Sequence, residues 1–149
     1  MRDKVKAKGM AEVILRDAKT GKIIHYEKRP NLVVDVGENM LAYLIAGDTT
    51  TKGYVQYMDI GDGSTTPSES DTSLAGTTTG PRKSVTYSVS GSSVTFEATW
   101  GSSEGNYTIN EAGLFTASTG GNMFNRVLIG PITKDSSMVL TIRITITFE

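Results

Sequence analysis

Residues 138–148 (MVLTIRITITF) alternate strictly between large apolar side chains and other residues. Every second position is apolar: Met138, Leu140, Ile142, Ile144, Ile146 and Phe148. A period of two places successive side chains on opposite faces of a β-strand, whereas a helix needs a period of 3.6. We therefore expect a central strand that buries one face completely, with Ile144 in the core.

Shorter segments with strand-like patterns recur along the chain and are separated by turn residues. We expect these strands at residues 4–16, 23–28, 54–60, 83–90, 94–100, 107–117 and 122–129. Ser and Thr make up 34 of the 149 residues, which suits strands joined by many turns. Short strands at roughly ten-residue spacing favour a mainly β fold, an antiparallel β-sandwich or barrel, and leave that choice open.

Two segments between the expected strands do not have a strand pattern. Residues 36–46 carry an apolar stripe at helical spacing, and Asp35 and Glu38 have the spacing of a capping box, so we expect one short α-helix that ends at Gly47. Residues 61–82 are long and almost without apolar side chains, and loops of this length are usually functional or mobile. A break is also expected at Pro131.

We expect a single domain, but the net charge differs in sign between residues 1–30 and residues 31–149. Residues 1–30 form an expected basic hairpin arm with nine basic and four acidic side chains, whereas residues 31–149, the β-rich body, hold six basic and twelve acidic ones. A basic arm on an acidic body predicts docking onto an acidic partner surface. The predicted docking residues are Arg2, Lys4, Lys6, Lys8, Arg16 and Lys19.

The sequence offers little for catalysis, and we expect no enzyme and no cofactor or metal. There is no cysteine, and His25, the only histidine, lies in an expected strand with no nucleophile motif beside it. The segment Asp59–Ser64 resembles part of a calcium loop but lacks ligands at the required spacing, so a glycine-rich turn is preferred. Trp100 is expected to fill a core or interface. We expect neither nucleic-acid nor membrane binding, because no nucleic-acid motif and no apolar span of sufficient length is present.

Three stretches follow one another along the chain: residues 31–37 (NLVVDVG), residues 60–74 (IGDGSTTPSESDTSL) and residues 111–115 (EAGLF), the last followed by Arg126-Val127. Together and in this order they resemble small virion structural proteins of tailed bacteriophages and the particle-attaching domains of tail-collar fibres. In those families the "GxGxxxP" loop and the "E-x-GLF" strand are scaffold features rather than catalytic ones. The resemblance covers roughly residues 31–148, and the chain ends at Glu149 without a fibre shaft.

The resemblance implies an accessory structural subunit of a phage virion, assembled in the cytoplasm of the bacterial host. It implies partners among the other capsid or tail proteins, and we expect a homo-oligomer. A tail, baseplate or collar adaptor and a capsid decoration (cement) protein both remain open. A carbohydrate-binding β-sandwich that mediates adhesion to a host surface is the alternative from another class, and it would require exposed aromatic residues gathered in one groove.

Overall fold

The computed structural model describes residues 5–149. Within this range the chain forms nine antiparallel strands and one helix: β1 (Ala7–Asp17), β2 (Ile23–Val33), α1 (Asp35–Ile45), β3 (Tyr57–Gly61), β4 (Lys83–Ser84), β5 (Thr86–Ser90), β6 (Ser93–Trp100), β7 (Thr108–Phe115), β8 (Met123–Thr133) and β9 (Met138–Phe148). The predicted mainly β fold with one short helix and an N-terminal hairpin is confirmed. Of the two architectures left open, the structure adopts a nearly closed barrel.

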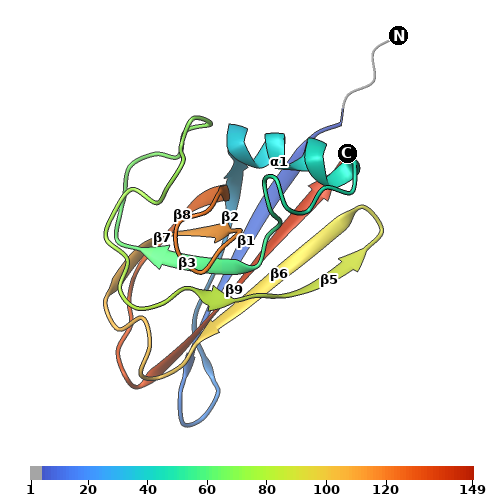
Figure 1. The fold of residues 1–149 in the computed structure, drawn as a ribbon. Helices are drawn as coiled ribbons and strands as arrows, with labels where there is room; N and C mark the ends of the chain where they lie inside the picture. Colours follow the sequence, from blue (N-terminus) through green and yellow to red (C-terminus); the bar gives the residue numbers. More distant parts are fainter. Residues whose placement is uncertain (1–4) are drawn as a thin grey trace.

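The strands follow the order β4-β3-β7-β8-β2-β1-β9-β6-β5 (Figure 1). The two ends of this series, β4 and β5, are consecutive parts of one segment, residues 83–90. β4 pairs with β3 and β5 pairs with β6, so this segment links the first strand of the series to the last. The sheet is therefore nearly closed: residues 83–84 pair with β3, whereas residues 86–90 pair only with β6.

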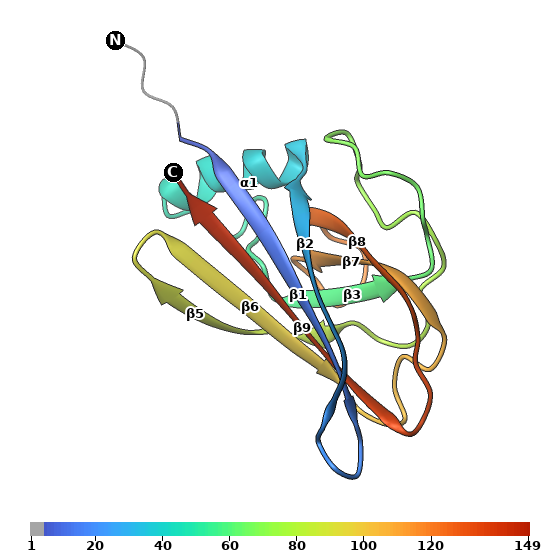
Figure 2. The same cartoon turned by 180° about the vertical axis from the view of Figure 1, so that it is seen from behind.

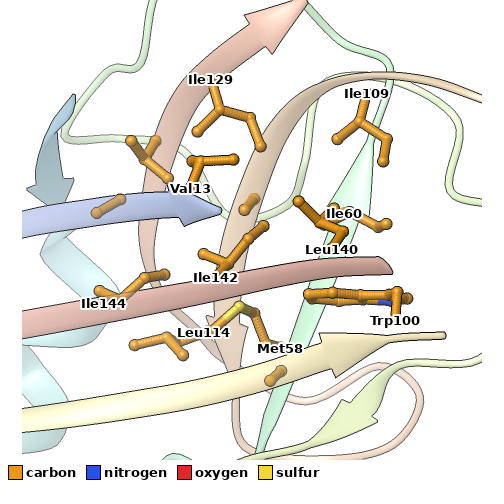
Figure 3. Close-up of a cluster of buried hydrophobic side chains, with 14 of the residues drawn as sticks. Val13, Met58, Ile60, Trp100, Ile109, Leu114, Ile129, Leu140, Ile142 and Ile144 are labelled. Atoms are coloured by element: carbon orange, nitrogen blue, oxygen red, sulfur yellow. The ribbon is translucent and has the colours of Figure 1, made fainter. Parts of the chain in front are cut away.

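The core lies inside the barrel and is centred on β9. This strand pairs along its length with β1 and β6, and the side chains of Leu140, Ile142, Ile144 and Ile146 are fully buried. Figure 3 shows Leu140, Ile142 and Ile144 among side chains from β1, β3, β6, β7 and β8, with the Trp100 ring beside Leu140. The predictions for the final strand and for Ile144 are confirmed, and Trp100 is a core residue, being only 2% exposed.

The N-terminal hairpin of β1 and β2 is part of this same sheet. β1 lies between β2 and β9 (Figure 2) and is hydrogen-bonded to both. It buries Ala11, Val13 and Leu15 in the core. The expected boundary at residue 30 falls inside β2. Because both edges of β1 are occupied, this strand cannot add to the sheet of a neighbouring subunit by main-chain pairing.

Helix α1 begins differently from the prediction. Its N-cap is Val34, which makes no side-chain capping bond, and the N–H of Asp35 instead donates to the carbonyl of Glu69 in the 61–82 loop at 2.8 Å. The predicted capping box is therefore wrong, whereas the left-handed Gly47 that ends the helix is confirmed by its φ of 79°. Across residues 5–149, no helix is long and apolar enough to cross a bilayer.

Several strand boundaries also differ from the pattern-based expectation, and three of them have a clear cause. β2 continues to Val33, because Leu32 and Val33 pair with β8. β8 continues through the expected break at Pro131 to Thr133, because the β7–β8 register shifts between Ile109 and Glu111 and leaves room for an unpaired proline. The β5–β6 turn contains Gly91 and Ser92 only, since Ser93 already pairs with Ser90.

Candidate functional site

Two buried charged side chains fix the 61–82 loop to the barrel. Glu111 on β7 is fully buried, and its carboxylate accepts hydrogen bonds from the backbone N–H groups of Ala75 (2.7 Å) and Gly76 (2.9 Å). Arg126 on β8 is 1% exposed and donates from Nε to Glu111 Oε1 at 3.1 Å. A charge buried this deeply is tolerated only when it is paired and hydrogen-bonded, and these two groups satisfy each other.

The remaining donors of Arg126 reach the first half of the same loop. Its guanidinium contacts the Asp71 carboxylate at 3.2 Å and the Thr65 carbonyl at 2.8 Å. One guanidinium–carboxylate pair, Glu111 and Arg126, thus holds both halves of the loop, and we call this pair the loop clamp. A clamp of this kind gives an otherwise polar, apolar-poor segment a fixed shape.

A second ion pair holds the C-terminal end of the loop. Arg82 donates to Asp59 Oδ2 at 3.3 Å and to the carbonyls of Ala117 and Gly120, both at 2.8 Å, and its guanidinium stacks 3.7 Å from the centre of the Phe115 ring. Burial raises the pKa of the Asp59 carboxyl above its usual value, and the hydrogen bonds from Ile60 and Arg82 offset this only in part. Arg82 therefore joins β3, the loop and the β7–β8 connection.

Glycines allow the loop to approach the clamp closely. A Cβ at Gly63 would overlap Glu111 Oε2 and the backbone nitrogen of Gly76, and a Cβ at Gly113 would lie 2.8 Å from the carbonyl oxygen of Asn125. The motif residues singled out in the sequence, the glycines of the loop and the Glu-Ala-Gly of β7, thus meet in one place. Their spacing is explained by backbone packing around the Glu111–Arg126 pair.

The three aspartates of the 59–71 segment contact separate partners. Asp59 pairs with Arg82, Asp62 accepts from the N–H of Thr77, and Asp71 accepts from Ser68 and Arg126. Among the residues that the structure places, no three His, Cys, Asp or Glu side chains come together as metal ligands would. The carboxylates of Asp59, Asp62 and Asp71 therefore orient backbone N–H groups and the guanidinium groups of Arg82 and Arg126.

The structure does not gather the predicted docking residues into one patch. Lys6 and Lys8 lie at the start of β1, where Lys8 is 3.3 Å from Glu149, whereas Arg16 and Lys19 lie at its other end and in the turn that follows. Lys8 and Arg16 lie eight positions apart along β1, which corresponds to roughly 26 Å of extended strand. Arg2 and Lys4 fall outside the described residues.

A comparison with protein-family models, curated proteins and solved structures gave no match. The site must therefore be interpreted from its geometry. His25, on β2, is half exposed and lies 3.8 Å from Glu27, with no described hydroxyl or thiol nucleophile hydrogen-bonded to it. The buried charges of Glu111 and Arg126 hydrogen-bond to backbone groups of the 61–82 loop, so their effect is to hold this surface loop in one conformation.

A second surface feature was missed at the sequence level. A groove of about 330 Å³ runs beneath α1, between the helix and the β5–β6–β9 face, and it is lined by apolar side chains, among them Leu41, Leu44, Tyr54, Tyr87, Val89 and Phe96. Tyr87 and Val89 remain 73% and 68% exposed. Alternation in 83–90 indicated one buried face, but the sequence could not show that this face meets a groove open to solvent.

The clamp itself had a weak signal in the sequence. Glu111 and Arg126 interrupt segments that are otherwise apolar and strand-forming, EAGLF and MFNRVLI. A charge within a buried strand requires a partner, so such a pair can be suspected before the fold is known. Which residues it would hold could not be derived, because the loop contacts depend on the β7–β8 register.

Proposed function

We propose that this chain is a non-enzymatic structural subunit of a tailed-phage virion, an accessory protein attached to the particle. The observation that carries the proposal is the loop clamp, in which Glu111 and Arg126 hold both halves of the 61–82 loop. The three segments that resemble phage virion proteins converge at or beside this clamp: residues 111–115 and 60–74 supply it, and Val33 pairs with β8 one residue from Arg126.

The geometry suits a protein that presents a fixed shape to a neighbour. The barrel is a rigid support with a central strand paired on both sides, and the polar loop on it is anchored at several points. Preordered loops bind partners with a smaller entropic cost than mobile ones. A particle subunit needs such a surface and needs no reaction chemistry.

The docking surface is proposed to include one of the two basic ends of β1. An exposed cluster of lysines steers association with an acidic surface, and its contribution falls with ionic strength because charges are screened over about 8–10 Å at physiological salt. Since Lys6 and Lys8 lie far from Arg16 and Lys19, the two groups can be tested separately. Attachment to the head and attachment to the tail both remain compatible with this surface.

Co-sedimentation with phage parts tests the proposal. Purified chain would be mixed with isolated heads and with isolated tails, using Lys6→Glu/Lys8→Glu and Arg16→Glu/Lys19→Glu as a matched pair of variants. We expect the wild type to sediment with one of the two parts, and one variant to bind at least ten-fold more weakly. Failure to sediment with either part, together with absence of the chain from purified virions by mass spectrometry, would refute the proposal.

The carbohydrate-binding alternative rests on two tyrosines, Tyr54 and Tyr87, which share the groove beneath α1. A sugar site combines such rings with polar side chains that fix the hydroxyl groups. The other side chains of this groove are aliphatic or phenylalanine, and Trp100 lies inside the core. The lining therefore fits an apolar protein surface better than a sugar.

A further inference from the structure

The strand β5 has a free hydrogen-bonding edge. Upstream of it, the N–H of Val85 donates to the carbonyl of Gln56 at 3.0 Å, on the side away from β6. Within residues 5–149, no other backbone hydrogen bond joins residues 85–90 to the segment 53–56. Backbone groups alternate in direction along a strand, so the N–H and C=O groups of Tyr87 and Val89 point the same way as those of Val85. Among the described residues, no strand pairs with this edge of β5.

This edge carries none of the features that protect exposed edges. No charged residue and no proline occurs between Lys83 and Glu97, and the β5–β6 register has no bulge. Soluble proteins usually shield free edges with charges, prolines or bulges, since an uncharged edge is open to pairing with another strand. The side chains of Tyr87 and Val89 are exposed as well and continue into the apolar groove beneath α1.

We propose that β5 pairs with β5 of a second copy of this chain, antiparallel and in the register that places the two Ser88 residues opposite each other on a two-fold axis. In this register Tyr87 of each copy faces Val89 of the other. Both residues have outward backbone groups, so the two Tyr87–Val89 pairs form four main-chain hydrogen bonds. The two sheets then join into one, and the two grooves become continuous.

The sequence of β5 identifies a second copy as the occupant. The strand β5 (TYSVS) alternates between small hydroxyl residues and the larger Tyr87 and Val89, and this pattern is the same in both chain directions. When two copies pair antiparallel about Ser88, each small hydroxyl residue therefore lies opposite another one, and each larger residue lies opposite a larger one. On the groove face, Tyr87 meets Val89, an aromatic and β-branched cross-strand pair that stabilises sheets. On the opposite face, Thr86 meets Ser90 and extends the hydroxyl pairs Thr95–Thr145 and Ser93–Thr147 that the chain already forms.

Cysteine cross-linking tests the register, because the chain contains no cysteine of its own. In the proposed pairing, the Ser88 residues form a non-hydrogen-bonded pair with Cα atoms about 4.5 Å apart. This separation lies within the range that a disulfide spans. The two Ser90 residues would be roughly 14 Å apart, which is too far.

Under mild oxidation, Ser88→Cys should form a covalent dimer in high yield, and the matched control Ser90→Cys should form little covalent dimer on a denaturing, non-reducing gel. Equal cross-linking of both variants, or none in either, would overturn the proposed register. Self-pairing needs no phage particle, so this result is independent of the co-sedimentation test.

Sedimentation equilibrium with charge variants tests the pairing itself. Tyr87→Lys/Val89→Lys places like charges opposite each other across the two-fold axis, whereas Tyr87→Glu/Val89→Lys places opposite charges there. Since both side chains are largely exposed, the fold of each variant should be retained, as checked by circular dichroism. We expect a wild-type dimer, at least a ten-fold weaker association of the first variant and a dimer for the second. A monomeric wild type up to millimolar concentration, or a first variant that associates as well as wild type, would refute the proposal.

Discussion

At the level of single residues, the Glu111–Arg126 pair makes the sharpest energetic prediction. Arg126→Met would leave the Glu111 carboxylate buried with only its two backbone donors and would release Thr65 and Asp71. Removing one partner of a buried ion pair typically lowers the free energy of unfolding by about 3–5 kcal/mol. We expect a loss of that size in urea unfolding, with faster cleavage of the 61–82 loop by a nonspecific protease.

A double variant separates the lost charge from the lost packing. Glu111→Gln/Arg126→Met removes both charges while an amide oxygen remains to accept from Ala75 or Gly76. We expect it to be more stable than Arg126→Met alone, because no uncompensated charge remains in the core. A double variant that is less stable than Arg126→Met would show that the charge on Glu111 is not what destabilises the single variant.

Gly113 is predicted to be required for close packing in the same region. A Cβ at this position would lie 2.8 Å from Asn125 O and 3.2 Å from the side chain of Leu74, and backbone atoms cannot move aside cheaply. Gly113→Val should therefore lower the free energy of unfolding by at least about 1–3 kcal/mol, the usual cost of overpacking a core. Gly101→Ala is the control, since the nearest atom to its Cβ would be Glu104 Oε1 at 3.5 Å. Equal melting temperatures for the two variants would contradict the role of Gly113.

At the level of elements, β9 was predictable because its signal is local. Alternation over eleven residues sets the face that is buried, and the structure has the same six side chains facing inward. The start of α1 was not predictable in this way. The group that satisfies the Asp35 N–H is the carbonyl of Glu69, 34 residues later, and no local pattern reports such a contact.

Matched truncations of isoleucine test how much of the stability resides in β9. Ile144 is fully buried between β1 and β6, whereas Ile45 at the end of α1 is 89% exposed. Ile144→Ala should lower the free energy of unfolding by about 2–5 kcal/mol, through lost apolar burial and the cavity left behind. Ile45→Ala should change it by less than about 0.5 kcal/mol. Similar values for the two variants in chemical denaturation would show that β9 is not the centre of the core.

At the level of the whole molecule, closure of the sheet depends on contacts that are distant in sequence. The sequence predicted the strands but left sandwich and barrel open, because the choice is made by residues 83–90 pairing with β3 on one side and β6 on the other. The contacts between the clamp and the loop likewise join residues that are 35 to 61 positions apart in the sequence. The kinds of residue in the candidate site were recognisable from the sequence, whereas their meeting point required the fold.

The two chain ends meet in the sheet, and this alters what a truncation measures. Lys6 and Glu149 exchange two backbone hydrogen bonds of 2.8 and 2.9 Å, and Ala7 and Lys8 pair with Phe148 and Thr147. Hydrogen-bonded pairs alternate along an antiparallel ladder, so deleting residues 1–8 removes two bonds from the Lys6–Glu149 pair and two from the Lys8–Thr147 pair. At about 0.5–1.5 kcal/mol for each lost hydrogen bond, this deletion should lower the free energy of unfolding by about 2–6 kcal/mol. Deleting residues 1–4 removes none of these bonds and serves as the control in urea unfolding. Equal stability of the two truncations would show that the paired ends contribute nothing to the free energy of unfolding.

This result bears on the docking test. If the longer deletion is the less stable, weaker particle binding by that variant cannot be assigned to lost charge alone. The Lys6→Glu/Lys8→Glu variant, which keeps the backbone pairing, then becomes the decisive measurement of docking.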